Sequence, residues 1–93
     1  MAILNAKPMS LDTMLNYQNN PHVEVTYKAK AVADGFALVA MISSLENALE
    51  RQRGGTRVFK TLNALLSFLA SRFGVKRFIV EADGWNPKQA EVN

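Results

Sequence analysis

The clearest alternation of hydrophobic and polar residues lies over residues 23–32. Valine, tyrosine and alanine occupy every second position there, with charged or polar residues between them. A period of two predicts a β-strand with one packed face and one solvated face. Asp34 and Gly35 then have the composition of a tight turn, and an almost unbroken apolar run predicts a more buried strand. We therefore predict a β-hairpin with strands at 23–32 and 35–42.

A helical pattern begins at Thr61, a favourable N-cap residue. Apolar side chains recur at i, i+3, i+4, i+7 and i+11, which places them on one side of a helix: Leu62, Leu65, Leu66, Leu69 and Phe73. Gly74 suits the position after a helix C-terminus. We predict a helix at 61–73, followed by a strand at 75–82.

Two segments leave alternatives open. Residues 44–53 fit either a helix capped by Ser44 or an edge strand, and we favour a strand at 46–53 for a reason that comes from a resemblance given below. Ser10 is placed to cap a short helix at 10–17. The alternative is that this region is an arm that becomes ordered on a partner, because so short a helix is marginal unless it is docked.

These elements predict an α+β fold. We expect an antiparallel sheet of about four strands with the helix 61–73 packed on one face. The chain of 93 residues is the length of one domain. We divide it into an N-terminal arm or short helix (1–21), a single domain (22–84) and a C-terminal tail (85–93).

The composition is that of a globular protein, since 48% of residues are hydrophobic and 20% are charged. Without cysteine, the chain has no disulfide, thiol catalyst or cysteine-ligated zinc, which fits a reducing cytoplasm. The sequence has neither an apolar run long enough to span a membrane nor a secretory apolar region. We expect a cytoplasmic protein without membrane contact.

Positive charge gathers around Gly54-Gly55, although the net charge is only +3. The cations on either side form a basic rim: Arg51, Arg53, Arg57 and Lys60. Two further cations, Lys76 and Arg77, open the last predicted strand. Guanidinium groups beside exposed backbone amides suit phosphates or carboxylates. The alternative is a solvated loop whose arginines pair with nearby acids, namely Glu46, Glu50 and Glu81.

Phe68 lies off the leucine stripe of the predicted helix. It could form a partner surface together with Trp85 and Ala64. The alternative is that Phe68 packs beneath the C-terminal tail.

No residues form a recognisable catalytic or metal-binding set. His22 is the single histidine and has only Glu24 near it in sequence, and the glycine pair lacks the Lys-Ser/Thr of a phosphate-binding loop. The carboxylates have turn or surface spacing. We expect no enzyme activity, no metal, no cofactor and no small-molecule substrate.

Three stretches carry a family resemblance: DGFALV at 34–39, RGGTRVFKTLNAL at 53–65 and GVKRFIV at 74–80. Over residues 23–82 the chain resembles small accessory proteins of bacterial plasmids and integrative elements, of the ParC-like partition-associated type. The resemblance implies a cytoplasmic protein of plasmid maintenance and a third strand at 46–53. It implies no catalytic residues.

We expect a non-enzymatic binding module that recognises another protein and could form a homodimer through a sheet edge or the Phe68 side. The alternative is a DNA-binding accessory factor that uses the basic rim from Arg51 to Lys60. DNA ranks second because few aromatic residues are placed for base stacking, and no recognition-helix pattern is evident.

Overall fold

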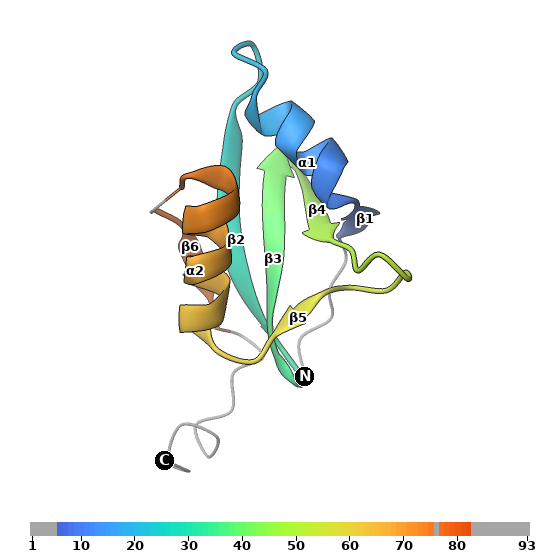
Figure 1. The fold of residues 1–93 in the computed structure, drawn as a ribbon, viewed down its shortest axis with the longest axis vertical. Helices are drawn as coiled ribbons and strands as arrows, with labels where there is room; N and C mark the ends of the chain where they lie inside the picture. Colours follow the sequence, from blue (N-terminus) through green and yellow to red (C-terminus); the bar gives the residue numbers. More distant parts are fainter. Residues whose placement is uncertain (1–5, 76, 83–93) are drawn as a thin grey trace.

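The computed structural model describes residues 6–75 and 77–82. Within these residues two helices and six strands follow one another along the chain (Figure 1). Their bounds are β1 (Lys7–Met9), α1 (Leu11–Gln18), β2 (Val25–Val32), β3 (Gly35–Ile42), β4 (Leu45–Leu49), β5 (Val58–Phe59), α2 (Leu62–Phe73) and β6 (Ile79–Glu81).

The strands form one mixed sheet in the order β1-β4-β3-β2-β6, and β5 also pairs with β3. β3 is antiparallel to β2, β4 and β5, but the edge strands β1 and β6 run parallel to β4 and β2. The prediction of an antiparallel sheet of about four strands was therefore wrong. The strand predicted at 75–82 is present as the shorter β6, and β1 was not predicted, because three residues are too few to show a period. In the chain, β1 precedes α1 and β6 follows α2. Helical connections are the usual way of bringing strands together in parallel.

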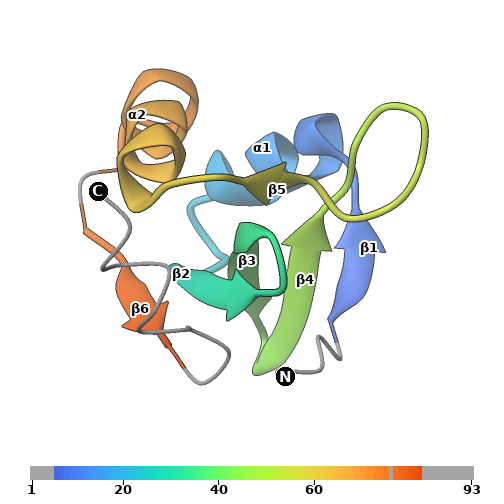
Figure 2. The same ribbon diagram turned by 90° about the horizontal axis from the view of Figure 1, so that it is seen from below.

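Both helices lie on the same face of the sheet, as Figure 2 shows. The core lies between them and the three central strands, and its buried side chains include Met14, Leu65, Leu69 and Phe73 from the helices and Tyr27, Leu38 and Leu49 from the sheet. The helix predicted at 61–73 is present as α2. Thr61 caps it by accepting a hydrogen bond from the Ala64 amide, and Gly74 ends it in the left-handed conformation. Leu66 is an exception to the stripe, because it is exposed.

The short N-terminal helix is docked on the sheet. Ser10 caps it by accepting a hydrogen bond from the Thr13 amide, and Met14 is fully buried. The Tyr27 hydroxyl donates a 2.5 Å hydrogen bond to Gln18, whose amide in turn donates to the Phe73 carbonyl. Burial and these two hydrogen bonds supply the stabilisation that a helix of eight residues lacks by itself.

The β3–β4 connection is a two-residue turn formed by Ser43 and Ser44. Both serines have positive φ, of 52° and 67°. The helical alternative for residues 44–53 was therefore wrong, since Ser44 is a turn residue and not a helix cap. The strand predicted at 46–53 is β4, which ends four residues earlier, at Leu49.

The predicted hairpin is present with its turn between residues 32 and 35, and its first strand begins two residues later than predicted, at Val25. Ala33 and Asp34 form the turn, and Gly35 is already paired with Val32. Glycine is required at this position because the backbone of β5 approaches it closely. A Cβ atom built on Gly35 would overlap the carbonyl oxygen of Phe59.

Candidate functional site

The site begins with an interruption in the strand opposite β3. Val39 lies opposite Ala48, and continuing that register would place Glu50 opposite Ala37. Val58 lies there instead, so the eight residues 50–57 are inserted between two collinear strand segments, β4 and β5. We call residues 50–57 the arginine loop. The loop projects from the sheet on the side of β4 and β1 (Figure 1).

The arginine loop is a small hairpin with its own hydrogen bonds. Its base is closed by a bridge between Glu50 and Thr56 and by a 2.9 Å bond from the Arg57 amide to the Leu49 carbonyl. At its tip, the Arg51 amide donates to the Gly55 carbonyl, and the Gly54 amide donates to the Arg51 carbonyl. Gly54 and Gly55 have φ of 88° and 82°, a region that glycine adopts without steric cost. The backbone therefore presents the arginines on a folded support.

Two guanidinium groups are positioned by contacts within or beside the loop. The Arg57 guanidinium lies 4.8 Å from the ring centroid of Phe59 and 4.6 Å from that of Phe68. Such cation–π contacts engage the flat face of the group and leave its N–H edges able to donate. The Arg51 Nε donates to the Gly54 carbonyl at 3.3 Å.

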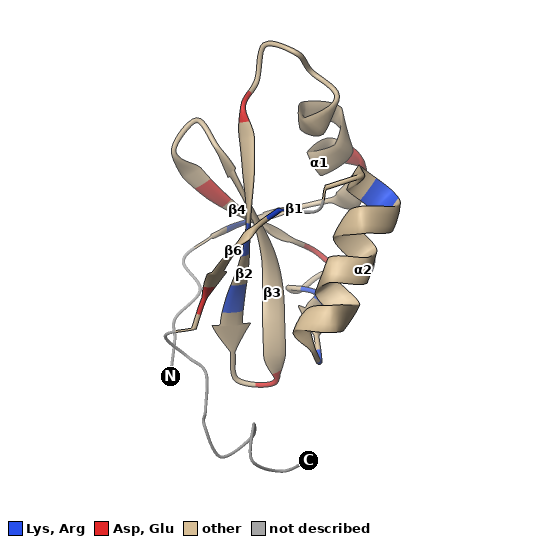
Figure 3. Ribbon diagram, turned by 90° about the vertical axis from the view of Figure 1, so that its left-hand side faces the viewer, with Lys and Arg blue, Asp and Glu red and all other residues tan. Residues whose placement is uncertain are grey.

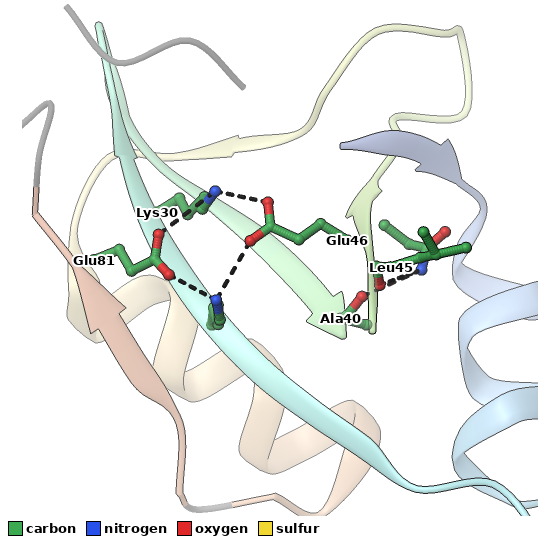
Figure 4. Close-up of polar contacts among 7 residues, drawn as sticks. Lys30, Ala40, Leu45, Glu46 and Glu81 are labelled. Carbon is green, nitrogen blue, oxygen red and sulfur yellow. Dashed lines mark hydrogen bonds and ion pairs between the residues drawn. The ribbon is translucent and has the colours of Figure 1, made fainter. Parts of the chain in front are cut away.

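The acids that could have neutralised these arginines do not pair with them. Among residues 6–75 and 77–82, no carboxylate lies within 4 Å of a charged nitrogen of Arg51, Arg53, Arg57 or Lys60. Glu46 and Glu81 instead contact Lys28 and Lys30, at 2.6–3.5 Å (Figure 4). The alternative in which the arginines pair with acids is not the arrangement in the described part of the chain.

The Lys28–Lys30–Glu46–Glu81 cluster lies on the sheet face away from the helices and joins β2, β4 and β6. Hydrogen bonds lower the carboxylate pKa values, chiefly that from Lys30 for Glu46 and that from Lys28 for Glu81. The same bonds raise the pKa values of Lys28 and Lys30. Two cations and two anions compensate one another, so this face offers no excess charge from the cluster.

Two grooves flank the arginine loop, and Arg51, Gln52 and Arg57 line both of them. The helix-side groove, of about 350 Å³, lies between the loop and the two helices and is also lined by Phe68 and Arg72. The turn-side groove, of about 810 Å³, lies towards the β2–β3 turn and is also lined by Asp34, Arg53, Thr56 and Val58. The shared residues form a ridge between the grooves.

The structure brings together only part of the predicted site. Arg51, Arg53 and Arg57 are exposed on one loop, and Lys60 is exposed just beyond β5. Arg77 is also exposed but precedes β6, at the opposite edge of the sheet (Figure 1). Lys76 lies outside the described residues.

Phe68 is half-buried and packs against two rings, with centroids 5.2 Å from Phe59 and 6.1 Å from Phe73. Its proposed neighbour Trp85 lies outside the described residues.

Two residues that line the grooves, Arg72 and Gln52, were not among the predicted site residues. The spacing of Phe68 and Arg72 was a usable signal, because residues four apart on a helix share a face.

Within the ranges that the structure describes, no group of three or more histidine, aspartate or glutamate side chains is arranged to hold a metal ion. None of the described helices has both the length and the apolar character needed to cross a membrane. Comparison with protein-family models, curated proteins and solved structures finds no match to this chain.

Proposed function

We propose that this protein is a non-enzymatic binding module whose arginine loop recognises an acidic segment of another protein. One observation carries the proposal: Arg51, Arg53 and Arg57 are exposed on one hairpin, and no described acid pairs with them. Unpaired guanidinium groups donate charge-assisted, often bidentate hydrogen bonds to carboxylates.

The surroundings of the loop favour a protein partner over nucleic acid. Asp12, Asp34 and Glu50 line the grooves beside the arginines, and this mixed charge suits separate carboxylates better than an unbroken line of phosphates. The helix next to the loop adds little positive charge, because Arg72 is the one charged residue of α2 (Figure 3). Arginine beside aromatic residues is instead typical of the energetic centres of protein interfaces.

The proposal is tested by fluorescence anisotropy with a labelled oligoglutamate peptide and with labelled duplex and single-stranded DNA. Replacing Arg51, Arg53 and Arg57 together by glutamine should weaken peptide binding by at least about tenfold. The control is Arg77→Gln, which removes one positive charge at the opposite sheet edge and is compared with each single arginine-to-glutamine change in the loop. Peptide binding that survives the triple change, or that falls equally in the control, contradicts the proposal.

DNA binding is the second candidate, supported by the same exposed cations. It predicts that affinity for duplex DNA falls steeply with salt, with a logarithmic slope of about 0.9 for each phosphate neutralised. Each arginine-to-glutamine change in the loop should then reduce that slope. DNA binding tighter than peptide binding at physiological salt would favour this candidate.

We also propose that the module can form a homodimer through the sheet edge at β6. In support, Ile79 and Val80 are 50% and 46% exposed on this three-residue edge strand. Exposed apolar edge strands are prone to pair with another chain. Light scattering should report a dimer for the natural chain and a monomer for Val80→Lys. A natural chain that stays monomeric at high concentration contradicts the homodimer proposal.

The setting that we propose is plasmid or mobile-element maintenance, which rests on the resemblance of residues 23–82 alone. The test is to delete the gene from its natural element and to measure retention of that element over generations without selection. Unchanged retention would count against this setting without affecting the binding proposal.

A further inference from the structure

We infer that the helix-side groove accepts a single carboxylate presented next to an apolar side chain. This inference rests on the proposed function, because it identifies which part of an acidic segment the arginine loop would hold. It adds that the anchoring cation is Arg57 and that α1 and α2 complete the site.

The groove is suited to one small group. Its volume of about 350 Å³ is at the lower end of the range for ligand pockets. Guanidinium groups line it from two elements, with Arg51 and Arg57 from the loop and Arg72 from α2. Its apolar lining consists of Leu11, Leu49 and Phe68. A ligand there would meet cations and apolar surface together.

Arg57 is already held in a position from which it can donate. Its guanidinium rests on Phe59 and Phe68, and Phe68 is itself packed against Phe73. A guanidinium that is positioned before binding loses less conformational entropy when a ligand arrives. Its N–H edges match the two oxygens of a carboxylate.

The charge of the lining selects a monoanion. The described residues that line the groove include three arginines and two acids, Asp12 and Glu50, so together they carry an excess of one positive charge. One carboxylate neutralises that excess, whereas a phosphate dianion would exceed it and would be repelled by the two acids.

The turn-side groove differs from the helix-side groove in the charge of its lining and in its apolar lining. Its charged lining among the described residues is Arg53 and Asp34 together with Arg51 and Arg57, which it shares with the helix-side groove, so its lining has one more net positive charge than that of the helix-side groove. Among the described residues that line it, none is aromatic and Val58 is the apolar one. The combination of carboxylate and apolar neighbour therefore fits the helix side of the loop.

The test is an NMR titration of the full chain with three probes: N-acetylphenylalanine, its neutral amide and inorganic phosphate. The acid should shift the side-chain Nε–H signals of Arg57 and Arg72 and the backbone amides of Leu11 and Phe68. The neutral amide and phosphate should bind at least about tenfold more weakly. Absence of these shifts at the solubility limit of the acid, or tighter binding of phosphate, overturns the inference.

Two variants separate the grooves. Arg72→Gln removes a cation that lines only the helix-side groove and should weaken binding of N-acetylphenylalanine by about tenfold. Arg53→Gln is the comparison, since Arg53 lines the turn-side groove and not the helix-side groove, and it should weaken binding of N-acetylphenylalanine several-fold less than Arg72→Gln does. Both side chains are exposed, so both variants should keep the fold.

Phe68→Leu tests the support beneath Arg57. The change keeps an apolar side chain but removes the ring, so affinity for the acid should fall although Arg57 is retained. The wild-type dispersion of the remaining NMR signals would show that the fold is intact. If a folded Phe68→Leu protein binds the acid with unchanged affinity, the Phe68 ring does not help to position the Arg57 guanidinium for binding.

The two proposals fail in different ways. If oligoglutamate binding is lost in Arg53→Gln but kept in Arg72→Gln, the arginine loop binds acidic protein but the helix-side groove is not the acceptor. If neither oligoglutamate nor N-acetylphenylalanine binds the natural chain, both proposals are overturned.

Discussion

Ser43 and Ser44 hold a backbone conformation that serine rarely adopts, with positive φ at both central positions of the β3–β4 turn. The left-handed region costs an L-residue about 1–2 kcal/mol, and asparagine and glycine are the residues that tolerate it. We predict that the double change Ser43→Asn, Ser44→Gly stabilises the protein by about 1 kcal/mol. Thermal unfolding should show this as a rise in Tm of about 4–8 °C for a domain of this size.

A control for that experiment is Ser44→Val, which adds a β-branched side chain at the same strained position and should lower Tm. If the asparagine–glycine turn leaves Tm unchanged or lowers it, the serines are stabilised by contacts that outweigh their backbone strain.

Gly35 presents the opposite case, in which the small residue is required. Its φ is 151°, and a Cβ atom would overlap the Phe59 carbonyl of β5. We predict that Gly35→Ala lowers the free energy of unfolding by at least about 2 kcal/mol, measured by urea denaturation. Gly54→Ala is the matched control, because a Cβ there meets no atom within 4 Å and only the φ of 88° is unfavourable. Equal losses in both variants would contradict the importance of the close approach.

Among the elements, β4 and β5 behave as one strand that the arginine loop interrupts. Removing residues 50–57 would join Leu49 to Val58, and Val58 already occupies the register position opposite Ala37. Alternation is also preserved, because Leu49 and Phe59 both face the core. We predict that the deletion variant folds, with a circular dichroism spectrum and Tm close to those of the natural chain.

Oligoglutamate binding by the same deletion variant should be lost, because Arg51, Arg53 and Arg57 are removed together. A variant that fails to fold would mean that the loop is part of the structural core. A folded variant that still binds would place the acidic-ligand site elsewhere.

The charged cluster ties β6 to the rest of the sheet, and its effect depends on pH. The pKa values of Glu46 and Glu81 are lowered on folding, so their contribution to stability is present above the ordinary value of 4.5 and is lost as pH falls through the lowered values. The pKa values of Lys28 and Lys30 are raised, so their contribution is present below 10.5 and is lost as pH rises through the raised values.

We predict that acid destabilises β6 first, since Glu81 is the β6 member of the cluster. Hydrogen exchange should become faster at the amides of Ile79–Glu81 below pH 4.5, before the amides of β3 respond. Glu81→Gln should weaken this pH dependence, whereas Glu24→Gln, on an exposed position before β2, should leave it unchanged. If the amides of β3 and β6 lose protection from exchange at the same pH, the charged cluster does not act locally on β6.

At the scale of the whole molecule, the sheet separates two different faces. One face holds both helices and the apolar core, and the other carries the compensated cluster of lysines and glutamates (Figures 2 and 4). The uncompensated arginines lie on the loop beside β4, where Arg57 packs on Phe59 and Phe68 at the border of the helix-bearing face. Within the described part of the chain, three exposed arginines are therefore concentrated at one side of the molecule, although the net charge is small.

Several elements could be predicted from sequence because their signals are local. The period of two placed β2, the turn and apolar run placed β3, and the Thr61 and Gly74 caps placed α2 within one residue of its ends. The basic rim was also visible, because Arg51, Arg53 and Arg57 are close in the chain. Short-range periodicity and capping need no knowledge of distant contacts.

Other features depend on residues that are far apart in sequence. β1 is a strand because β4 supplies its hydrogen-bond partners, and no local pattern in its three residues indicates this. The strand predicted at 75–82 is present as the shorter β6, Ile79–Glu81, and its parallel pairing with β2 could not be read from its own residues. Glu81 meets Lys28 and Lys30 across more than half of the chain, which removed it as a partner for the arginines. Phe68 and Arg72 join the loop only because α2 packs beside it.

The sequence by itself determined the main helix, the central hairpin and the existence of a cluster of cations, because each depends on neighbouring residues. Only the tertiary structure decided that β4 and β5 are one interrupted strand, that the acids are engaged elsewhere and that a groove lies between loop and helices. The physical reason is that strand register and side-chain pairing are set by packing between distant segments, which favours one arrangement among many that local propensity allows.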